Sequence, residues 1–562
     1  MEPTAKSNIP RLHSWLRMPV ITFDYQDFLS LLGHDIPKET LIEKLPMVGG
    51  DLGGVNGDQI NIEFFPNRPD LTSVEGIARV CRAFFGFQPG LQTYPLSSSA
   101  IRLTVDPSVK TVRPFVTTAY VKDVTMSDAL ITSLMGLQEK LHVGLGRNRK
   151  KVAIGVHDAD AVTPPFTYKA VPPDSLSFVP LAMEESMTLS EILLRHEKGK
   201  DYAHLLKGFS KYPVILDAKG QVLSFPPIIN GRLTEVTPQT HNLFIDVTGT
   251  DRKAINIALN IVATALAERK GTIHRTAVSD EGREIISPDL STTKHELKIP
   301  EVNRLLGTSF SGAAISDYLQ RMGHNVSVLG ETSLLVEVAS WRSDILHMVD
   351  LIEDVAVGFG YDQFSMDFPK AMTFGRLLPS TLSNNSLRLL LIGLGFHEVT
   401  TFTISNEQDE IKKMGKHPEK WVEIANPIGE EFNGMRVSLL PSMLKLLREN
   451  RHHPLPQQIF EVGVVVDSSA KNRWHLAGIK VDAKANFTEC KSYIEAIGRG
   501  CGCSFAFIEG QNHAFIDGRC ATVQANTKDI GMFGELHPRT IQAFSLEHPC
   551  IAFELIIDEF IT

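Results

Sequence analysis

Cysteine is scarce in this chain: it has six cysteines among 562 residues, and five of them follow residue 489. So few thiols cannot form a disulfide framework, which favours a reducing compartment and predicts a cytoplasmic protein. The Cys501-Gly-Cys503 spacing lacks the paired arrangement of a zinc site, so a structural role is favoured over metal binding.

Long apolar runs are also lacking. No run approaches the roughly 18 to 20 residues needed to cross a bilayer, and the most apolar helical stretch, 254–267, is interrupted by Asn256, Asn260 and Thr264. It predicts a buried helix rather than a membrane span. Residues 1–17 are polar and contain proline, with no apolar signal-peptide core; they are expected to be a disordered extension, with Met18 as an alternative start.

An excess of positive charge is missing as well, since the net charge is −9. This argues against a protein that coats nucleic acid by charge alone, because phosphate binding needs clustered Lys and Arg. Any RNA contact must be local or shared with a partner. The densest basic run, 147–151, fits either a phosphate backbone or a solvated loop.

What the chain has is length, enough for roughly three to five compact units. Strand-like and helix-like stretches alternate throughout, which predicts an α+β multidomain protein. The expected segments are an N-terminal α+β domain at 18–95, a large α+β unit at 100–272, a small unit at 289–366 and a C-terminal antiparallel sheet with helices at 367–562.

Local patterns predict several elements. A helix is expected at 25–32, and the glycine-rich string GGDLGGVNGD at 49–58 predicts a turn cluster between strands, because it lacks the Lys-Ser/Thr ending of a phosphate-binding loop. Asp70 and Thr72 are candidate caps for the helix that follows them. Residues 251–270 carry apolar side chains at helical intervals, and strand runs are read in VEIAN, QQIFEVGVVV and IAFELIID.

The most informative local pattern is the helix predicted within residues 340–362. With Asp344 as N-cap, apolar residues fall on one face, while Asp350, Glu353 and Asp354 gather on the other. Like charges at this spacing repel by a few tenths of a kcal/mol, about 0.2–0.5 per pair. A hard cation such as Mg²⁺ would offset that cost; from spacing alone, a solvated acidic face is the favoured alternative.

Six separated strings now suggest a family. They are FFPNRPDLTSVEGIAR, RKKVAIGVHDADAVTPPFTYKAV, VLSFPPIING, NLFIDVTGTD, the acidic helix and FGELHP, in that order. Together they resemble the beta subunit of archaeal and eukaryotic-type phenylalanyl-tRNA synthetases, from about Met18 to the C-terminus. The resemblance implies that Asp344, Asp350, Glu353 and Asp354 bind magnesium.

The resemblance also implies that the 100–272 unit is an editing domain, which hydrolyses tyrosine wrongly attached to the phenylalanine tRNA. An apolar pocket rejects a substrate that merely adds a hydroxyl by only about a hundredfold, so a second site is needed. Ser224, Asp246 and Thr248 resemble the family's editing residues, and His157 and Asn230 are weaker candidates. The alternatives are that Asp246 caps a turn before Gly249 and that His157 is a satisfied core histidine.

The C-terminal unit resembles the catalytic fold of class II synthetases, yet the stretch from Met435 to Ser438 lacks the Arg-x-Glu pair that holds ATP in that class. The resemblance therefore implies a non-catalytic domain here, with phenylalanine and ATP used on an alpha subunit, in an assembly of two alpha and two beta chains. Rival interpretations are a free-standing editing hydrolase and a non-catalytic tRNA-binding paralogue.

Overall fold

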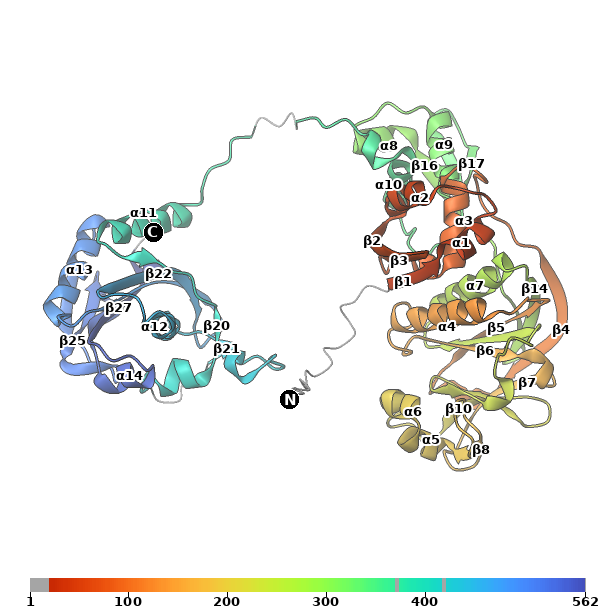
Figure 1. The fold of residues 1–562 in the computed structure, drawn as a ribbon, viewed down its shortest axis with the longest axis horizontal. Coiled ribbons are helices and arrows are strands. Elements are labelled where there is room, and N and C mark those ends of the chain that lie inside the picture. The colour runs from red at the N-terminus through yellow and green to blue at the C-terminus, as the bar shows by residue number, and fades with distance from the viewer. Residues whose placement is uncertain (1–19, 369–372, 417–420, 561–562) are drawn as a thin grey trace. The chain divides into compact units, whose positions relative to one another are not determined.

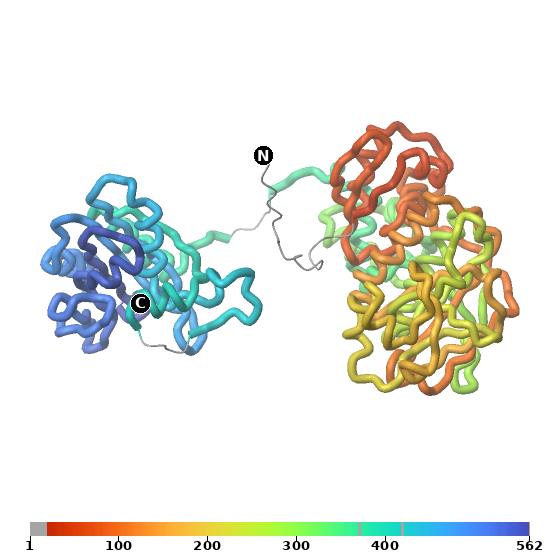
Figure 2. The backbone as a smooth tube through the Cα atoms, turned by 60° about the horizontal axis from the view of Figure 1, so that its bottom comes forward, coloured from red at the N-terminus to blue at the C-terminus, as the bar shows by residue number. Residues whose placement is uncertain are grey.

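The computed structural model describes residues 20–368, 373–416 and 421–560, so the predicted disordered extension lies outside the described residues. The chain divides into two compact units, the first ending at Asp367 and the second beginning at Phe368 (Figure 1). Both mix helices and strands, as the sequence predicts. Figure 2 follows the chain from the red start of the first unit to the blue end of the second.

The first unit begins with a small three-stranded sheet and helices packed on it. Its elements are β1 (Val20–Asp24), α1 (Tyr25–Leu32), α2 (Lys38–Lys44), β2 (Gly50–Asn56), β3 (Gln59–Phe64) and α3 (Val74–Phe84), with sheet order β1-β3-β2. The turn-cluster prediction for 49–58 is wrong in part, because most of these glycines lie in edge strand β2. The helix cap is Ser73, since Asp70 pairs with Arg68 instead.

A ten-stranded sheet forms the centre of the first unit. Its strands run in the order β12-β11-β10-β7-β4-β14-β5-β13-β6, with β15 beside β14. The bounds are β4 (Leu96–Val105), β5 (Phe115–Lys122), β6 (Val152–Asp158), β7 (Phe166–Val171), β10 (Tyr212–Leu216), β11 (Val222–Phe225), β12 (Ile229–Asn230), β13 (Leu243–Gly249), β14 (Thr272–Asp280) and β15 (Arg283–Ser287). Only β4 pairs in parallel, with β14 and β7. This sheet carries the candidate site.

Two long helices, α4 (Asp128–Val143) and α7 (Arg252–Glu268), lie beside each other against this sheet (Figure 1). The periodicity of 251–270 correctly predicts α7. Along β13, Ile245 and Val247 join the core that α7 covers. Because side chains alternate across a strand, Asp246 and Thr248 project from the opposite face. This region also contains two short strands and two short helices: β8 (Ser177–Phe178), β9 (Met187–Thr188), α5 (Leu189–Arg195) and α6 (Glu197–Tyr202).

The last part of the first unit is a three-stranded sheet with three helices. It contains β16 (Thr293–Lys298), α8 (Ile299–Leu306), α9 (Gly312–Arg321), β17 (Asn325–Val328), β18 (Ser333–Val338) and α10 (Met348–Phe359). The acidic helix is shorter than predicted. Its N-cap is His347, not Asp344, and Asp350 closes a capping box by accepting the His347 amide hydrogen. Asp344 instead forms an ion pair with Arg342.

The second unit is built on a seven-stranded sheet, order β19-β22-β23-β27-β26-β25-β24. Its members are β19 (His397–Glu398), β22 (Gln457–Val466), β23 (Asn472–Val481), β24 (Phe505–Glu509), β25 (Phe515–Ala525), β26 (Lys528–Leu536) and β27 (Cys550–Ile556), with α11 (Pro379–Gly393), α12 (Leu440–Glu449), α13 (Phe487–Gly500) and α14 (Pro538–Ala543). All its pairings are antiparallel except β19 with β22. The predicted antiparallel sheet is thus confirmed, but VEIAN is not a strand: it contributes one isolated bridge at Glu423.

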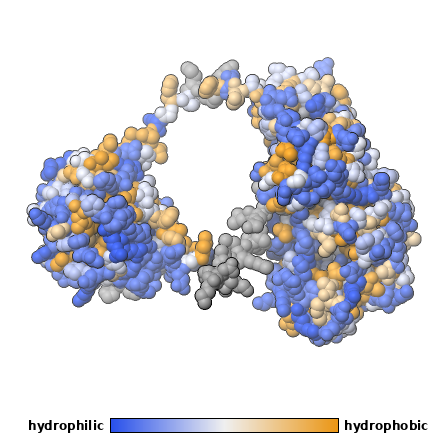
Figure 3. Space-filling view, in the orientation of Figure 1, coloured by the Kyte–Doolittle hydropathy of each residue, from blue (hydrophilic) through white to orange (hydrophobic). Residues whose placement is uncertain are grey.

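Hydrophilic residues cover much of the visible face of each unit (Figure 3). Within the described ranges, no helix is long and apolar enough to cross a membrane. All six cysteines are free thiols.

Candidate functional site

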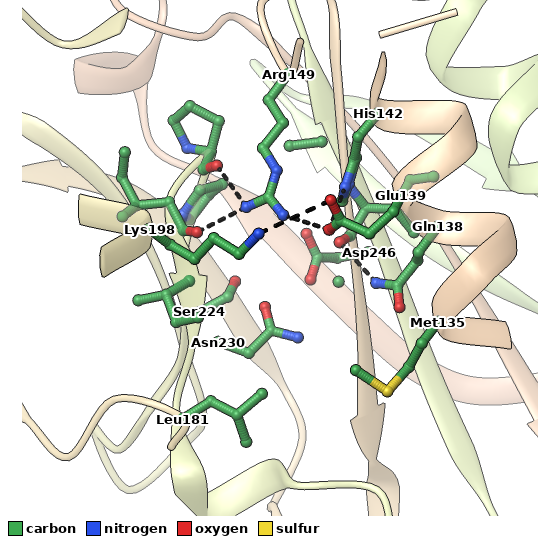
Figure 4. Close-up of a pocket in the computed structure, with 17 residues that line it drawn as sticks. Met135, Gln138, Glu139, His142, Arg149, Leu181, Lys198, Ser224, Asn230 and Asp246 are labelled. Atoms are coloured by element: carbon green, nitrogen blue, oxygen red, sulfur yellow. Dashed lines mark hydrogen bonds and ion pairs between the residues drawn. The ribbon is translucent and has the colours of Figure 1, made fainter. Parts of the chain in front are cut away.

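A partly open cavity of about 170 Å³ lies at the β6 edge of the central sheet. Residues from α4, β6, β11, β12 and β13 line it, so segments far apart in the sequence meet there (Figure 4). Three of the five editing candidates, Ser224, Asn230 and Asp246, line this cavity. His157 and Thr248 lie beside it without lining it.

Asp246, which lines the cavity, forms a buried pair with His157 behind it. His157 Nε2 lies 2.7 Å from Asp246 Oδ2, and both side chains are excluded from solvent. On the other side of the ring, Nδ1 lies 2.8 Å from the Thr234 hydroxyl. The two ring nitrogens thus contact the carboxylate on one side and the hydroxyl on the other, so Asp246, His157 and Thr234 form one hydrogen-bonded chain.

The strand register explains how this pair forms. Asp246 on β13 lies directly opposite Gly155 on β6, and His157 lies two residues further on. A diagonal pair on one face is close enough for long side chains to meet. Gly155 leaves room for the contact, since a Cβ there would lie 2.2 Å from Asp246 Oδ2 and 2.6 Å from His157 Nε2.

Ser224 supplies a polar group with an unfilled hydrogen-bonding capacity. Its Oγ is buried and has no hydrogen-bond partner among the described residues, although the residue lines the cavity. A buried hydroxyl without a partner costs about 1–3 kcal/mol. Asn230 lies opposite Ser224 in the β11–β12 pair. Its side-chain Nδ2 donates one long hydrogen bond, 3.4 Å, to the Val156 carbonyl. Both side chains can therefore accept a ligand contact.

Thr248 is tied to a buried arginine. Its Oγ1 accepts a hydrogen bond from Arg113 Nε at 2.9 Å, and its carbonyl accepts one from the same guanidinium at 2.7 Å. Burial lowers the pKa of Arg113 to about 10. The same guanidinium donates to the Arg149 and Lys150 carbonyls. Arg113 thus links Thr248 to the loop that borders the cavity.

A charged wall on the α4 side was missed by sequence reasoning. Arg149 donates to Glu139 at 2.6 Å and to the Ile228 carbonyl at 2.8 Å, and it stacks 4.5 Å from the Tyr202 ring centre. The hydrogen bond from His142, together with Arg149, lowers the pKa of Glu139 to about 2. Burial lowers the pKa of His142 to about 4. Arg149 belongs to the basic run already noticed, but nothing in the pattern distinguishes the one cation that points inward.

The four predicted magnesium ligands do not converge. Asp344 and Asp354 both accept from Arg342, each at 2.7 Å, and Asp354 also pairs with His324 at 2.6 Å. Burial by itself raises the pKa of Asp354, but Arg342 and His324 outweigh it and hold this pKa far below its usual range. Among the described residues, no group of three or more His, Cys, Asp or Glu side chains is arranged to hold a metal.

The remaining two carboxylates lie apart from this buried pair. Asp350 accepts backbone amide hydrogens at the start of α10, and Glu353 is exposed. The donor chemistry suits a hard cation, but this arrangement does not form a closed site.

In the second unit, the stretch from Met435 to Ser438 is occupied by internal contacts. Arg436 is buried and pairs with Glu461 at 2.9 Å, and it also donates to the Val464 carbonyl at 2.8 Å. Glu554 accepts from the Ser438 hydroxyl and from the backbone amide of Leu439. The charged side chains of Arg436 and Glu554 are therefore engaged by other groups of this chain.

Comparison with known proteins follows this geometry. Residues 129–273 match the B3/4 domain, residues 295–361 the tRNA synthetase B5 domain, and residues 365–557 the phenylalanyl tRNA synthetase beta chain CLM domain. A crystal structure of an N-terminal fragment of the phenylalanyl-tRNA synthetase beta subunit from Pyrococcus horikoshii matches with a TM-score of 0.59 and 35% identity, covering 61% of this chain and 99% of the fragment.

Full-length relatives are similar over almost the whole chain. The phenylalanine–tRNA ligase beta subunit of Methanothrix thermoacetophila is 44% identical over 96% of this chain and 99% of its own length. That of Archaeoglobus fulgidus is 43% identical over 97% and 99%. The chain therefore belongs to the family of phenylalanine–tRNA ligase beta subunits.

Proposed function

We propose that this chain, with an alpha subunit, attaches phenylalanine to its tRNA using ATP, and that the cavity at the β6 edge hydrolyses tyrosyl-tRNA made in error. The observation that carries the second part is the convergence of Ser224, Asn230 and Asp246 on one cavity. Three polar side chains from three strands, one of them lacking a partner, suit a ligand that is itself polar and fits a pocket of single-residue size.

Tyrosine differs from phenylalanine by one hydroxyl group. A site built to hydrogen-bond a hydroxyl rejects the analogue lacking it by about 10⁴-fold, because the buried polar groups are then left unpaired. Asp246 accepts the hydrogen bond from the phenol, and Ser224 supplies a second polar contact. His157 and Thr234 fix the carboxylate by the chain of hydrogen bonds behind it.

Hydrolysis itself needs only water and orientation. A water molecule adds to the ester carbonyl carbon, the bond from that carbon to the ribose oxygen breaks, and tyrosine and a free ribose hydroxyl leave. Asn230, at the cavity wall, donates to the ester oxygen as negative charge develops there. Holding the ester and water together accounts for the acceleration by proximity.

We propose that the synthetic reaction takes place on the alpha subunit. This rests on the second unit, where Arg436 is engaged by Glu461 and the stretch to Ser438 lacks an Arg-x-Glu pair. An assembly of two alpha and two beta chains in the cytoplasm, with Mg²⁺ at Asp344, Asp350, Glu353 and Asp354, remains part of the proposal. No step above depends on that metal.

The editing proposal is tested with phenylalanine tRNA mischarged with tyrosine. We expect the purified full-length chain to release tyrosine, and Asp246→Ala to release it at least about 100-fold more slowly, since the phenol loses its acceptor. Ser224→Ala removes a group without a partner and should leave folding intact while lowering the rate. Wild-type chain that leaves tyrosyl-tRNA unchanged contradicts the proposal.

The synthetic part is tested by co-expression with the alpha subunit of the same genome. We expect phenylalanine attachment only from the pair. If the alpha chain charges tRNA equally well alone, this chain is an accessory factor.

A further inference from the structure

The loop of residues 147–151 is unusually well fixed for an exposed basic run. Arg147, Asn148 and Arg149 have φ values of 48°, 53° and 64°, a left-handed region that non-glycine residues seldom occupy. The backbone amides of Asn148 and Arg149 donate to carbonyls at the end of α4, and Lys151 donates to the Gly146 carbonyl. The loop is therefore held in one conformation.

Two buried arginines pin the loop to the cavity. Arg113 donates to the carbonyls of Arg149 and Lys150 from inside the sheet. Arg149 turns inward, lines the cavity and pairs with Glu139. Backbone strain of about 1–3 kcal/mol per residue persists only when its surroundings enforce it, and these contacts do so.

The other cations of the loop divide into two kinds. Lys151 is neutralised by Asp251 at 3.0 Å. Arg147 and Lys150 are exposed, and neither side chain makes a hydrogen bond or ion pair with any residue the structure describes. They flank the residue that forms the cavity wall. Lys198 also lines the cavity and forms an ion pair with Glu139 at 3.9 Å.

We propose that Arg147 and Lys150, which flank Arg149 in the loop, form a docking surface for the phosphates of an RNA 3′ end that leads into the cavity. This inference rests on the proposed hydrolysis of tyrosyl-tRNA, because it describes how the RNA part of that substrate is held. A free amino-acid ester needs no cations outside the cavity, whereas an ester on RNA carries a chain of phosphates out of it.

Charge and rigidity favour RNA over an acidic protein segment. The chain as a whole has a net charge of −9. Two unpaired cations beside the cavity are therefore a local positive feature and not part of a generally basic surface. Cations that bind phosphate release counterions, which gives a salt dependence of about 0.7 in log-log slope for each contact to single-stranded nucleic acid. Because the loop backbone is already held by hydrogen bonds, it loses less conformational entropy when a ligand binds.

The test uses the full-length double variant Arg147→Gln/Lys150→Gln. With tyrosyl-tRNA we expect KM to rise about 10-fold at physiological salt with kcat unchanged, and the slope of log KM against log salt to fall by about 1.4, or two contacts. Binding of uncharged phenylalanine tRNA should weaken equally. Hydrolysis of 3′-O-tyrosyl-adenosine, which has no phosphate chain, should be unchanged.

A matched control removes the same charge elsewhere: Lys294→Gln/Lys298→Gln on β16 should leave all three measurements at wild-type values. Unchanged KM and salt slope in the loop variant overturn the inference. An equal loss with tyrosyl-adenosine overturns it too, because the loop is then only a wall of the cavity. Normal tRNA kinetics with weaker association to the alpha subunit overturn it in favour of a protein contact. Wild-type chain that hydrolyses neither ester contradicts the proposed function instead, while tRNA binding still tests the surface.

Discussion

His157 Nε2 lies 2.7 Å from Asp246 Oδ2, with both side chains buried and with Gly155 as the residue that leaves space between them. The contact is diagonal across two strands. This contact links the fold to the cavity. Asp246 lines the cavity, and His157, which does not line it, orients the Asp246 carboxylate.

Gly155→Ala should break this relationship. The new methyl group would lie 2.2 Å from Asp246 Oδ2, so the carboxylate or the imidazole must move. We expect tyrosyl-tRNA hydrolysis to fall at least about 10-fold and the free energy of unfolding to fall by about 1–3 kcal/mol.

The control for this variant is Gly136→Ala in α4. Its added Cβ meets only the flexible Lys140 Nζ, at 3.2 Å, and alanine is favoured in a helix by about 1 kcal/mol. Stability should be equal or higher and hydrolysis unchanged. Normal hydrolysis by Gly155→Ala would show that the geometry of the pair is unimportant.

Thr248 is expected to act through Arg113. Thr248→Val removes the acceptor for Arg113 Nε, which leaves a buried charged donor unpaired at a cost of about 1–3 kcal/mol. The loop held by the same guanidinium should loosen, so hydrolysis should fall several-fold together with stability. Thr248→Ser keeps the hydroxyl and should restore both. Thermal unfolding and hydrolysis are measured on the same samples; full stability in the valine variant contradicts this role.

The sequence predicts those elements in which one physical signal dominates. Helix α7 follows from its apolar periodicity, and the core confirms it. The glycines of β2 mislead because glycine suits turns, yet pairing with β3 is enough to hold them extended. The alternating run at 422–426 fails for the opposite reason: its pattern fits a strand, but only one isolated bridge forms there.

Charged side chains are the harder case. Arg149 and Glu139 are ten residues apart, and their pairing depends on the left-handed turn that returns the chain to α4. The sequence pattern of 147–151 shows four cations but not which one turns inward. Likewise, the acidic face of α10 does not reveal that Asp354 is buried against Arg342 and His324.

Glu410 should make the stability of the second unit depend on pH. Burial raises its pKa to about 7, from an ordinary value of 4.5. Because the folded pKa is the higher one, the folded state binds more protons between these values. The stabilising contribution is complete below about pH 4.5 and is lost as pH rises through 7.

Glu410→Gln should remove this dependence. The amide oxygen can still accept from the Val437 and Ser438 amides, which the carboxylate holds at 3.1 and 3.3 Å. At pH 8 the variant should be more stable by about 3.5 kcal/mol, since the pKa of Glu410 is raised from 4.5 to about 7 and one pKa unit is worth about 1.4 kcal/mol. Near pH 4.5 it should match the wild type. Calorimetry of the full chain at both pH values measures this, and equal gains at both would contradict a titration of Glu410.

The magnesium prediction can be separated from the arginine-held arrangement by thermal unfolding. If Asp344, Asp350, Glu353 and Asp354 bind Mg²⁺, the ion must compete with Arg342 for two of them, so binding should be weak. With a Kd of about 1 mM, 10 mM Mg²⁺ adds about 1.4 kcal/mol to the stability of the first unit. Glu353→Gln should abolish that gain without disturbing the fold, because this carboxylate is exposed. Glu331→Gln, at another exposed carboxylate, should keep it. Should Mg²⁺ leave the wild type and both variants unchanged, the carboxylates of this chain serve Arg342 and the helix cap rather than a metal.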